Sequence, residues 1–220
     1  MKLVVMATGN KGKVKEVRQI VPGAQVLTMK EVGLSMDIIE DGTSFRENAL
    51  IKAHAVYKAI QEGKANVKAE DVDLVISDDS GLEIDYFDKK PGIYSARWLG
   101  QDTPYTIKNQ TILEKMKDVP DDKRTARYVC AMAAIMKDGE EFETEETAEG
   151  FIAHEAAGQN GFGYDPIFYF PPLGTFAQIS PEQKNAVSHR GKALRAMKEL
   201  LDASGLADTN AETGKGSEAQ

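Results

Sequence analysis

Leu74-Val75-Ile76-Ser77, followed directly by Asp78-Asp79-Ser80-Gly81-Leu82, is the stretch that most constrains the fold of this chain. The apolar run is typical of a buried strand, which we expect over residues 73–77, and the acidic residues then mark the point where that strand ends. Two adjacent carboxylates are costly to bury, so such a cluster usually binds a hard cation or handles a proton. An exposed acidic turn is the alternative, since Asp, Ser and Gly are ordinary turn residues.

Strand-like and helix-like patterns alternate around this strand, and a long hairpin joined around Asp138-Gly139 follows them. Ser44 and Glu47 have capping-box spacing at the head of one helix. The expected strands cover residues 3–7, 25–28, 73–77, 124–136 and 141–153, and the expected helices cover 12–20, 104–117 and the segments that begin near Ser44 and Ser188. This order predicts an α/β fold with a mixed sheet rather than a purely parallel one.

The composition, with 41% apolar and 28% charged residues, is that of a globular protein. No apolar run approaches the ~18 residues of a membrane span, and the first seven residues are too short for a signal peptide. Cys130 is the single cysteine, so no intrachain disulfide can form and a reducing cytoplasm is expected. The formal net charge of −8 argues against broad nucleic-acid binding, although a local basic cluster can still bind a small anion. We therefore expect a cytoplasmic protein without a membrane or nucleic-acid partner.

The C-terminal segment, residues 203–220, differs in composition from the rest of the chain. It consists mainly of small and polar residues and contains no aromatic residue. Such a segment buries too little apolar surface to offset its ordering entropy. We expect one domain over residues 1–202 and a disordered polar tail after it.

Thr8-Gly9-Asn10-Lys11-Gly12-Lys13 lies between the first expected strand and the first expected helix. Such a junction offers free backbone N–H groups and the positive end of a helix dipole, both of which favour phosphate. The two glycines let the backbone approach a ligand closely, while Lys13 adds a positive charge and the threonine and asparagine add hydrogen-bond donors. The segment lacks the Gly-Lys-Ser/Thr ending of a Walker A loop, and an ordinary turn is the alternative.

Two later segments carry residue types that bind nucleotides. Gly161-Phe162-Gly163-Tyr164-Asp165-Pro166 combines a carboxylate with aromatic rings, which can stack on a base at about 1–3 kcal/mol per base. Lys184-Asn185-Ala186-Val187-Ser188-His189-Arg190 places three potentially cationic side chains near a helix N-terminus, for which Ser188 is the expected N-cap. Cations there oppose the helix dipole unless an anion is present. Aromatic rings that pack inward and a solvated basic turn are the respective alternatives.

Glu40-Asp41 precedes Gly42 and the helix that begins near Ser44. Paired acids at this place can supply a second ligand for a cation. They can equally be favourable charges ahead of a helix start, since the helix dipole attracts negative charge there.

Six segments therefore occur in order along the chain. They are Thr8-Gly9-Asn10-x-x-Lys13-x-x-Glu16, Glu40-Asp41-Gly42-Thr43-Ser44-Phe45-x-Glu47-Asn48-Ala49, Asp78-Asp79-Ser80-Gly81-Leu82, Pro91-Gly92-Ile93-Tyr94-Ser95-Ala96-Arg97, Gly161-Phe162-Gly163-Tyr164-Asp165-Pro166 and Ser188-His189-Arg190. With these segments in register, the chain closely resembles the inosine triphosphate pyrophosphatase family, the bacterial dITP/XTP diphosphatases, over roughly residues 2–201.

The resemblance implies a long mixed β-sheet with flanking helices, two lobes around a central cleft, and a homodimer. It implies that a deaminated purine triphosphate (ITP, dITP or XTP) is hydrolysed to the monophosphate and pyrophosphate, which keeps such bases out of DNA and RNA. It also implies Mg²⁺ as the cofactor, with Mn²⁺ as a substitute.

The resemblance further implies the roles of individual residues. Asp79 would be the general base and, together with Glu40, a metal ligand, and Phe162 would stack on the purine. The substrate-binding residues that it implies are Thr8, Gly9, Asn10, Lys11, Gly12, Lys13, Ser80, Phe162, Gly163, Tyr164, Asp165, Lys184, His189 and Arg190.

Base selection is expected to depend on the 6-position of the purine. Hypoxanthine and xanthine carry an oxo acceptor where adenine carries an amino donor, so a donor such as Arg190 should favour the former. The alternative functions are a pyrophosphatase of modified pyrimidine triphosphates, a non-catalytic nucleotide sensor and a partner-binding protein. A sensor would not need the carboxylates of Asp78 and Asp79, whose presence counts against it.

Overall fold

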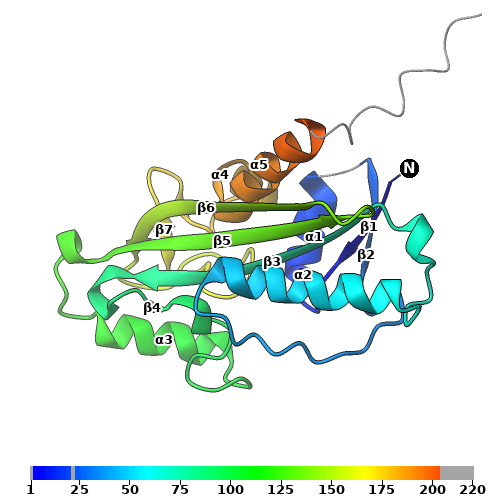
Figure 1. The fold of residues 1–220 in the computed structure, drawn as a ribbon. Coiled ribbons are helices and arrows are strands. Elements are labelled where there is room, and N and C mark those ends of the chain that lie inside the picture. The colour runs from blue at the N-terminus through cyan, green and yellow to red at the C-terminus, as the bar shows by residue number, and fades with distance from the viewer. Residues whose placement is uncertain (1, 21–22, 204–220) are drawn as a thin grey trace, which may run out of the picture.

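The computed structural model describes residues 2–20 and 23–203, and in these ranges eight strands form one open mixed sheet (Figure 1). The predicted tail, from residue 204 onward, lies outside the described residues. The strands are β1 (Lys2–Met6), β2 (Ala24–Thr28), β3 (Leu74–Ile84), β4 (Lys90–Pro91), β5 (Thr125–Met136), β6 (Glu141–Ile152), β7 (Phe168–Phe170) and β8 (Gly174–Thr175). The helices are α1 (Lys11–Ile20), α2 (Phe45–Gln61), α3 (Tyr105–Lys115), α4 (Pro181–Val187) and α5 (His189–Ala203).

The sheet combines a parallel part and an antiparallel part, so the predicted mixed α/β fold is confirmed. The strand order is β2-β1-β3-β5-β6-β7-β8, with β4 paired to the end of β3. β1 pairs in parallel with β2 and β3, whereas β3, β5, β6, β7 and β8 pair in antiparallel fashion. The predicted hairpin is β5 and β6, whose register runs from Thr125 opposite Phe151 to Ile135 opposite Glu141.

The prediction that β3 ends at Ser77 is wrong. The strand continues through the acidic residues to Ile84, and Asp78 and Asp79 pair with Met132 and Ala131 of β5. Polar residues can lie inside a sheet when each side chain has a partner, and the two carboxylates find theirs on the flanking helices. Because successive side chains of a strand point to opposite faces, the two aspartates face different layers of the molecule.

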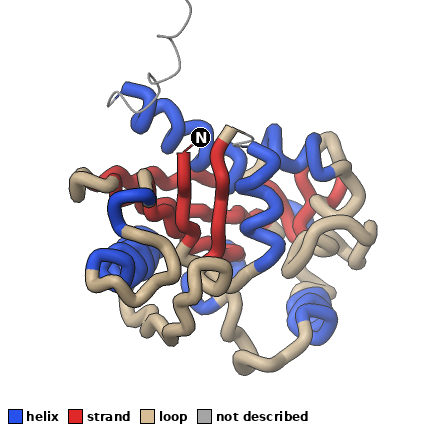
Figure 2. The backbone as a smooth tube through the Cα atoms, turned by 90° about the vertical axis from the view of Figure 1, so that its right-hand side faces the viewer, coloured by secondary structure: helices blue, strands red, loops and turns tan. Residues whose placement is uncertain are grey.

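Side chains that alternate along β5 hold helices on both faces of the sheet. Cys130 and Met132 pack with Leu194 and Met197 of α5, whereas Ala131, Ala133 and Ile135 pack with Phe45, Ala49 and Ala53 of α2. Burial of apolar surface, worth about 25 cal/mol per Å², stabilises these layers. Figure 2 shows helices on both sides of the sheet.

A further hydrophobic cluster forms the second lobe. Ile112 and Met116, from α3 and its C-terminal end, pack there with Leu82, Ile84 and Phe168, which come from the far ends of the long strands and from β7. One cleft is lined both by residues of this cluster, Tyr128 and Tyr164, and by residues of the clusters around β1, such as Ala7 and Val14. In the described ranges, no helix is long and apolar enough to cross a membrane.

Ser44 and Ser188 are helix N-caps, as expected, and one helix was not predicted. Ser44 accepts a hydrogen bond from the Glu47 backbone N–H, but the Glu47 carboxylate bonds Thr43 rather than closing a capping box with Ser44. Ser188 accepts from the Gly191 N–H at the head of α5, which confirms the expected N-cap. The missed helix, α4, begins with a complete capping box between Ser180 and Gln183.

Candidate active site

A large cleft of about 1460 Å³ collects the predicted site residues. Its walls come from the turn after β1, from the loop that leads to α2, from the middle of β3 and from the segment that follows η3 (Gly92–Tyr94). Residues 162–165 and the start of α5 complete the walls. Every predicted catalytic, metal-binding or substrate-binding residue lines this cleft except Gly12.

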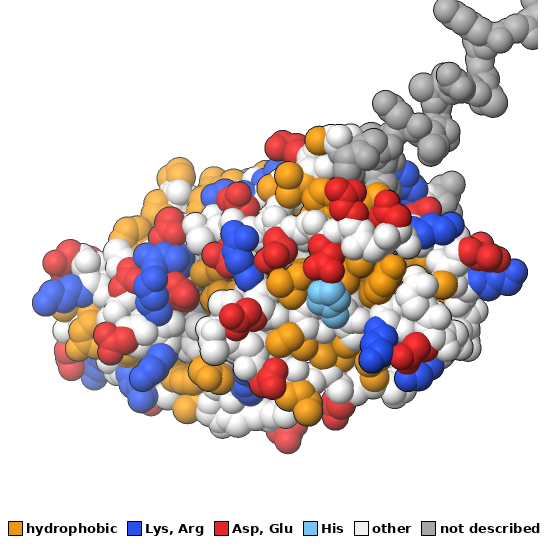
Figure 3. All heavy atoms as spheres, in the orientation of Figure 1, with side chains coloured by type: hydrophobic (Ala, Val, Ile, Leu, Met, Phe, Trp, Pro, Cys, Tyr) orange, Lys and Arg blue, Asp and Glu red, His pale blue; other side chains and the backbone are white. Residues whose placement is uncertain are grey.

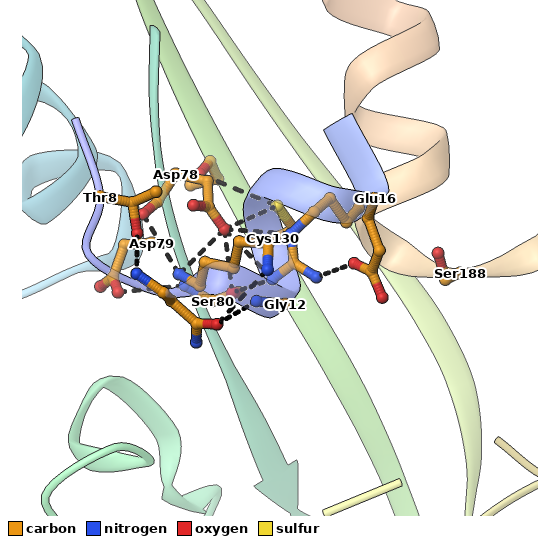
Figure 4. Close-up of polar contacts among 12 residues, drawn as sticks. Thr8, Gly12, Glu16, Asp78, Asp79, Ser80, Cys130 and Ser188 are labelled. Atoms are coloured by element: carbon orange, nitrogen blue, oxygen red, sulfur yellow. Dashed lines mark hydrogen bonds and ion pairs between the residues drawn. The ribbon is translucent and has the colours of Figure 1, made fainter. Parts of the chain in front are cut away.

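Asp78 lies on the α1 and α5 side of β3, where it neutralises two cations. Its Oδ2 is 2.9 Å from Lys13 Nζ and 3.2 Å from Arg190 Nη2, and it accepts a hydrogen bond from the Ser80 hydroxyl at 3.2 Å (Figure 4). Burial raises the pKa of this carboxyl, but Lys13 and Arg190 outweigh it and hold the pKa far below its ordinary value. Asp78 is therefore a permanent negative charge that holds Lys13 and Arg190 in place.

Asp79 lies on the α2 side of β3, away from Asp78. Its Oδ2 accepts a hydrogen bond from Asn48 Nδ2 at 3.1 Å, and its Oδ1 is 3.5 Å from Lys52 Nζ. Burial raises the pKa of Asp79 above its ordinary value, and Glu40 contributes, although Lys52 acts in the opposite direction. A carboxylate with a raised pKa is a better proton acceptor at neutral pH than an ordinary one.

Glu40 and Asp79 share one positive charge. Lys52 Nζ lies 2.8 Å from Glu40 Oε2 and 3.5 Å from Asp79 Oδ1, so the ammonium group occupies the space where both carboxylates can reach a cation. Mg²⁺ prefers oxygen ligands and is usually bound by one or two carboxylates together with substrate phosphates. The oxygen donors of Glu40 and Asp79 fit this preference.

The turn after β1 begins α1 with Asn10 as its cap. Asn10 Oδ1 accepts a hydrogen bond from the Gly12 N–H at 2.9 Å, and Thr8 Oγ1 accepts one from the Asn10 N–H at 3.1 Å. No atom lies within 4 Å of a Cβ added at Gly9, so the turn is open there, as expected for a phosphate site. Gly12 has another role, because an added Cβ would lie 2.8 Å from the Phe162 ring.

Asp165 fixes the loop over residues 161–165 through its hydrogen bonds. Its Oδ2 accepts from the Phe162 N–H and from Lys184 Nζ, both at 2.8 Å, and its Oδ1 accepts from the Tyr128 hydroxyl at 3.3 Å. Tyr164 is also buried and donates to the Ser95 carbonyl at 2.8 Å. These two residues therefore position the Phe162 ring, which lies 4.7 Å from Lys184 Nζ and stays accessible from the cleft.

His189 and Arg190, at the start of α5, are both buried. The His189 ring stacks on Tyr128 at 4.5 Å, and its Nδ1 has no partner in the described part of the chain. Burial and the neighbouring Arg190 lower the pKa of His189 well below its ordinary value, so the ring is neutral. Arg190 is only 2% exposed and donates to Asp78, Glu16 and Ser80. Its expected role in reading the base stays a prediction.

Four residues that contact the predicted site were given no role there from the sequence, although three of them stand in the six segments quoted above. They are Glu16, Asn48, Lys52 and Arg97. Glu16 lies three positions after Lys13, and Lys52 lies four positions after Asn48, so helical spacing alone places each pair on one face. That spacing was the signal that could have identified Glu16 and Lys52.

Glu16 gives the site a dependence of stability on pH. It lies 2.8 Å from Lys184 Nζ and bonds Arg190. Although burial raises its pKa, Arg190 and Lys184 lower it below the ordinary value. A carboxyl whose pKa is lowered on folding stabilises the fold above its unfolded pKa and loses that effect as the pH falls through the folded pKa.

We expect Glu16→Gln to lower the free energy of unfolding by about 1–3 kcal/mol at pH 7, because charged hydrogen bonds are lost. The difference from the wild type should stay constant down to about pH 5 and shrink below about pH 4. Urea titrations of both proteins across this pH range measure the difference in the free energy of unfolding. A difference that stays constant down to pH 2.5 would exclude an ionised Glu16 as its cause.

Known proteins resemble this chain in sequence and in fold. Residues 4–200 match the Ham1 family. A dITP/XTP pyrophosphatase of Clostridium perfringens is 39% identical over 91% of this chain and 98% of that protein, and one of Bacillus subtilis is 41% identical over 92% and 98%. The solved structure of the Staphylococcus aureus Ham1 protein is similar with a TM-score of 0.78 at 36% identity, over 92% of this chain and 100% of that chain. The chain belongs to the Ham1 family.

Proposed function

We propose that this protein hydrolyses deaminated purine nucleoside triphosphates (ITP, dITP and XTP) to the monophosphate and pyrophosphate. The observation that carries the proposal is one cleft lined by Asp79, whose pKa is raised, by the open turn at Gly9 and by the accessible Phe162 ring. The names of the relatives, dITP/XTP pyrophosphatase, support the same substrates. Removal of these nucleotides would keep deaminated bases out of DNA and RNA.

Asp79 is the general base in this proposal. Asn48 donates to one carboxylate oxygen at 3.1 Å, and the Ser80 N–H donates to the other at 3.0 Å, so the carboxylate is fixed at the cleft wall beside Lys52. From there Asp79 accepts a proton from the attacking water. Hydrolysis of a phosphoanhydride depends mainly on positioning and charge neutralisation, to which Lys13 and the open turn at Gly9 contribute by holding the phosphates.

Glu40 and Asp79 would hold Mg²⁺, or Mn²⁺ in its place. When bound, the ion supplies positive charge that offsets the charge of the phosphates. The protein keeps the carboxylates of Glu40 and Asp79 close together around the single ammonium group of Lys52.

The base is recognised at the other end of the cleft. Phe162 stacks on the purine, and the neutral His189 ring offers one donor and one acceptor. Arg190 supplies a donor that favours a 6-oxo group over the amino group of adenine.

The wider assignments follow from the same proposal. An enzyme of the nucleotide pool works in the cytoplasm, and the resemblance favours a homodimer. Nucleic acid is not a ligand in this proposal, because the net charge is −8 and the face in Figure 3 shows acidic and basic side chains intermixed. Light scattering coupled to gel filtration measures the mass and thereby tests the dimer.

A panel of triphosphates tests the substrate class. We expect kcat/KM for ITP, dITP and XTP to exceed the values for ATP and GTP by at least about a hundredfold, the order that a mispaired buried polar group produces. A modified pyrimidine triphosphate belongs in the same panel. Preference for that nucleotide, or for ATP, would contradict the proposal.

The Phe162 ring offers a test of base stacking. Phe162→Ala should weaken the apparent binding of ITP by about 1–3 kcal/mol, while the ratio of kcat/KM for ITP to that for ATP changes little, because stacking tolerates any base. Tyr86→Ala is the matched control, since Tyr86 is an exposed aromatic in η2 (Asp85–Phe87), outside the cleft. Unchanged ITP binding in the Phe162 variant would contradict the stacking role.

A further inference from the structure

The loop over residues 161–165 contains a tight turn that shapes one wall of the cleft. The Phe162 carbonyl accepts a hydrogen bond from the Asp165 N–H at 3.3 Å, so these two residues close a β-turn around Gly163 and Tyr164. The φ of Gly163 is +68°, whereas the φ of Tyr164 is negative. This combination is that of a type II′ turn, which favours glycine at the first of its two central positions.

The central peptide of this turn, between Gly163 and Tyr164, is held from the second lobe. Asn109 of α3 donates a hydrogen bond from Nδ2 to the Gly163 carbonyl at 3.1 Å. Asn109 is buried and does not line the cleft, whereas Gly163 and Tyr164 do. The C=O and N–H groups of a trans peptide point in opposite directions. Because the carbonyl points to Asn109, behind the wall, the Tyr164 N–H points toward the cleft.

The two central N–H groups of the turn are free to meet a ligand. Within the described part of the chain, the N–H groups of Gly163 and Tyr164 have no hydrogen-bond partner. The N–H groups of Phe162 and Asp165, in contrast, are both bonded inside the loop. Backbone donors that the protein covers are nearly always paired. Two unpaired donors at a cleft wall therefore point to a ligand that carries an acceptor.

The Asn109 side chain forms one hydrogen bond and leaves its other polar atom unpaired. Its Oδ1 is buried and has no partner in residues 2–20 and 23–203. An unpaired polar atom in the interior destabilises a fold, and an apolar side chain of similar size would avoid that loss. Among the described residues, only the bond to the Gly163 carbonyl gives an amide a task at this position.

We propose that Asn109 is a positioning residue for base selection, which holds the turn so that the Tyr164 N–H donates to the 6-oxo group of the purine. When the purine stacks on Phe162, its edge lies beside the next two residues of the loop. An N–H there pairs with the oxo acceptor of hypoxanthine but leaves the amino group of adenine mispaired. A central peptide turned over would present its carbonyl and favour adenine instead. The inference rests on the proposed function, which supplies the purine substrates, and adds a backbone donor to that of Arg190.

Calorimetric binding of IMP and AMP tests this role without turnover. The wild type should bind IMP more tightly than AMP. Asn109→Leu, which leaves the Gly163 carbonyl without a donor, should raise the Kd of IMP about tenfold and leave the Kd of AMP within about twofold. Asn109→Gln, which keeps the amide donor, should recover part of the loss. The matched control is Gln110→Leu, because Gln110 is an exposed residue of α3 that bonds Glu114 at 3.1 Å.

The ratio of the two Kd values separates base selection from a structural role. Near-ultraviolet circular dichroism shows that each variant retains the fold. A folded Asn109→Leu variant with an unchanged ratio, or with an equal rise of both Kd values, would overturn the inference, as would a wild type that binds IMP and AMP equally. If the wild type prefers IMP but releases no pyrophosphate from ITP, the proposed function fails while the role of Asn109 can still be read from binding.

Discussion

Asp79→Asn should fold normally and lose most of its activity on ITP. The amide keeps the shape of the side chain and can still contact Asn48, but it removes the negative charge beside Lys52 and the basicity that the water requires. Loss of a well-placed general base typically lowers kcat by about 10²–10⁴-fold. Steady-state release of pyrophosphate, with the melting temperature as a measure of folding, tests this expectation.

The control for this variant is Asp121→Asn, because Asp121 is an exposed aspartate that pairs with His154 at 2.7 Å outside the cleft. It should keep kcat within about twofold, as expected for a surface pair. If Asp79→Asn folds and keeps near-wild-type turnover, the general base lies elsewhere and the assignment of Asp79 is wrong.

Arg190→Met should destabilise the fold by about 3–5 kcal/mol, because removal of one partner of a buried ion pair leaves an uncompensated charge. Arg190 is 2% exposed, and its loss would leave the fully buried Asp78 with Lys13 as its remaining ion-pair partner. Methionine fills much of the space of the arginine stem, so the change reports charge rather than a cavity. The midpoint and slope of a urea titration measure the loss.

Lys198→Met on the same helix is the matched control, since Lys198 is exposed and forms an (i, i+4) pair with Asp202. Its cost should be no more than about 1 kcal/mol. Equal stability of the Arg190 variant and the wild type would show that Asp78 does not need the guanidinium.

The expected role of Arg190 in base selection is better tested with Arg190→Lys, which keeps the charge. The measurement is the ratio of kcat/KM for ITP to kcat/KM for ATP.

The order of strands and helices could be predicted from the sequence because local patterns determine it. The hairpin at Asp138-Gly139 and the caps at Ser44 and Ser188 are local signals, and the structure confirms them as elements. The end of β3 could not be predicted in this way. Its polar residues resemble a turn until the helices that satisfy them are known, since Ser77 bonds the Ala49 carbonyl of α2 and Asp79 bonds Asn48.

The interpretation of Asp78 and Asp79 as a pair was wrong for the same reason. Adjacent residues share a site in a turn, but in a strand they point to opposite faces. Asp78 therefore neutralises Lys13 and Arg190, while Asp79 faces Lys52 and Glu40. Once β3 is extended to Ile84, the alternation of its side chains separates the two roles without further information.

The sequence could predict residues that meet at one cleft, but neither all of their neighbours there nor their internal pairing. All the predicted residues except Gly12 line one cleft, because the ends of their elements meet there. Which cation pairs with which carboxylate depends on contacts between distant segments, such as Lys184 with Glu16 and Arg97 with the Glu40 carbonyl. No local pattern encodes those distances.

The most direct test of the central claim is the identity of the first products from ITP. Phosphorus NMR of a reaction with Mg²⁺, stopped before completion, distinguishes the four candidate species. We predict that IMP and pyrophosphate appear together in equal amounts from the earliest time point, and that both appear at least about a hundredfold more slowly when Asp79→Asn replaces the wild type. Appearance of IDP and orthophosphate as first products would contradict cleavage between the α and β phosphates and, with it, the proposed function.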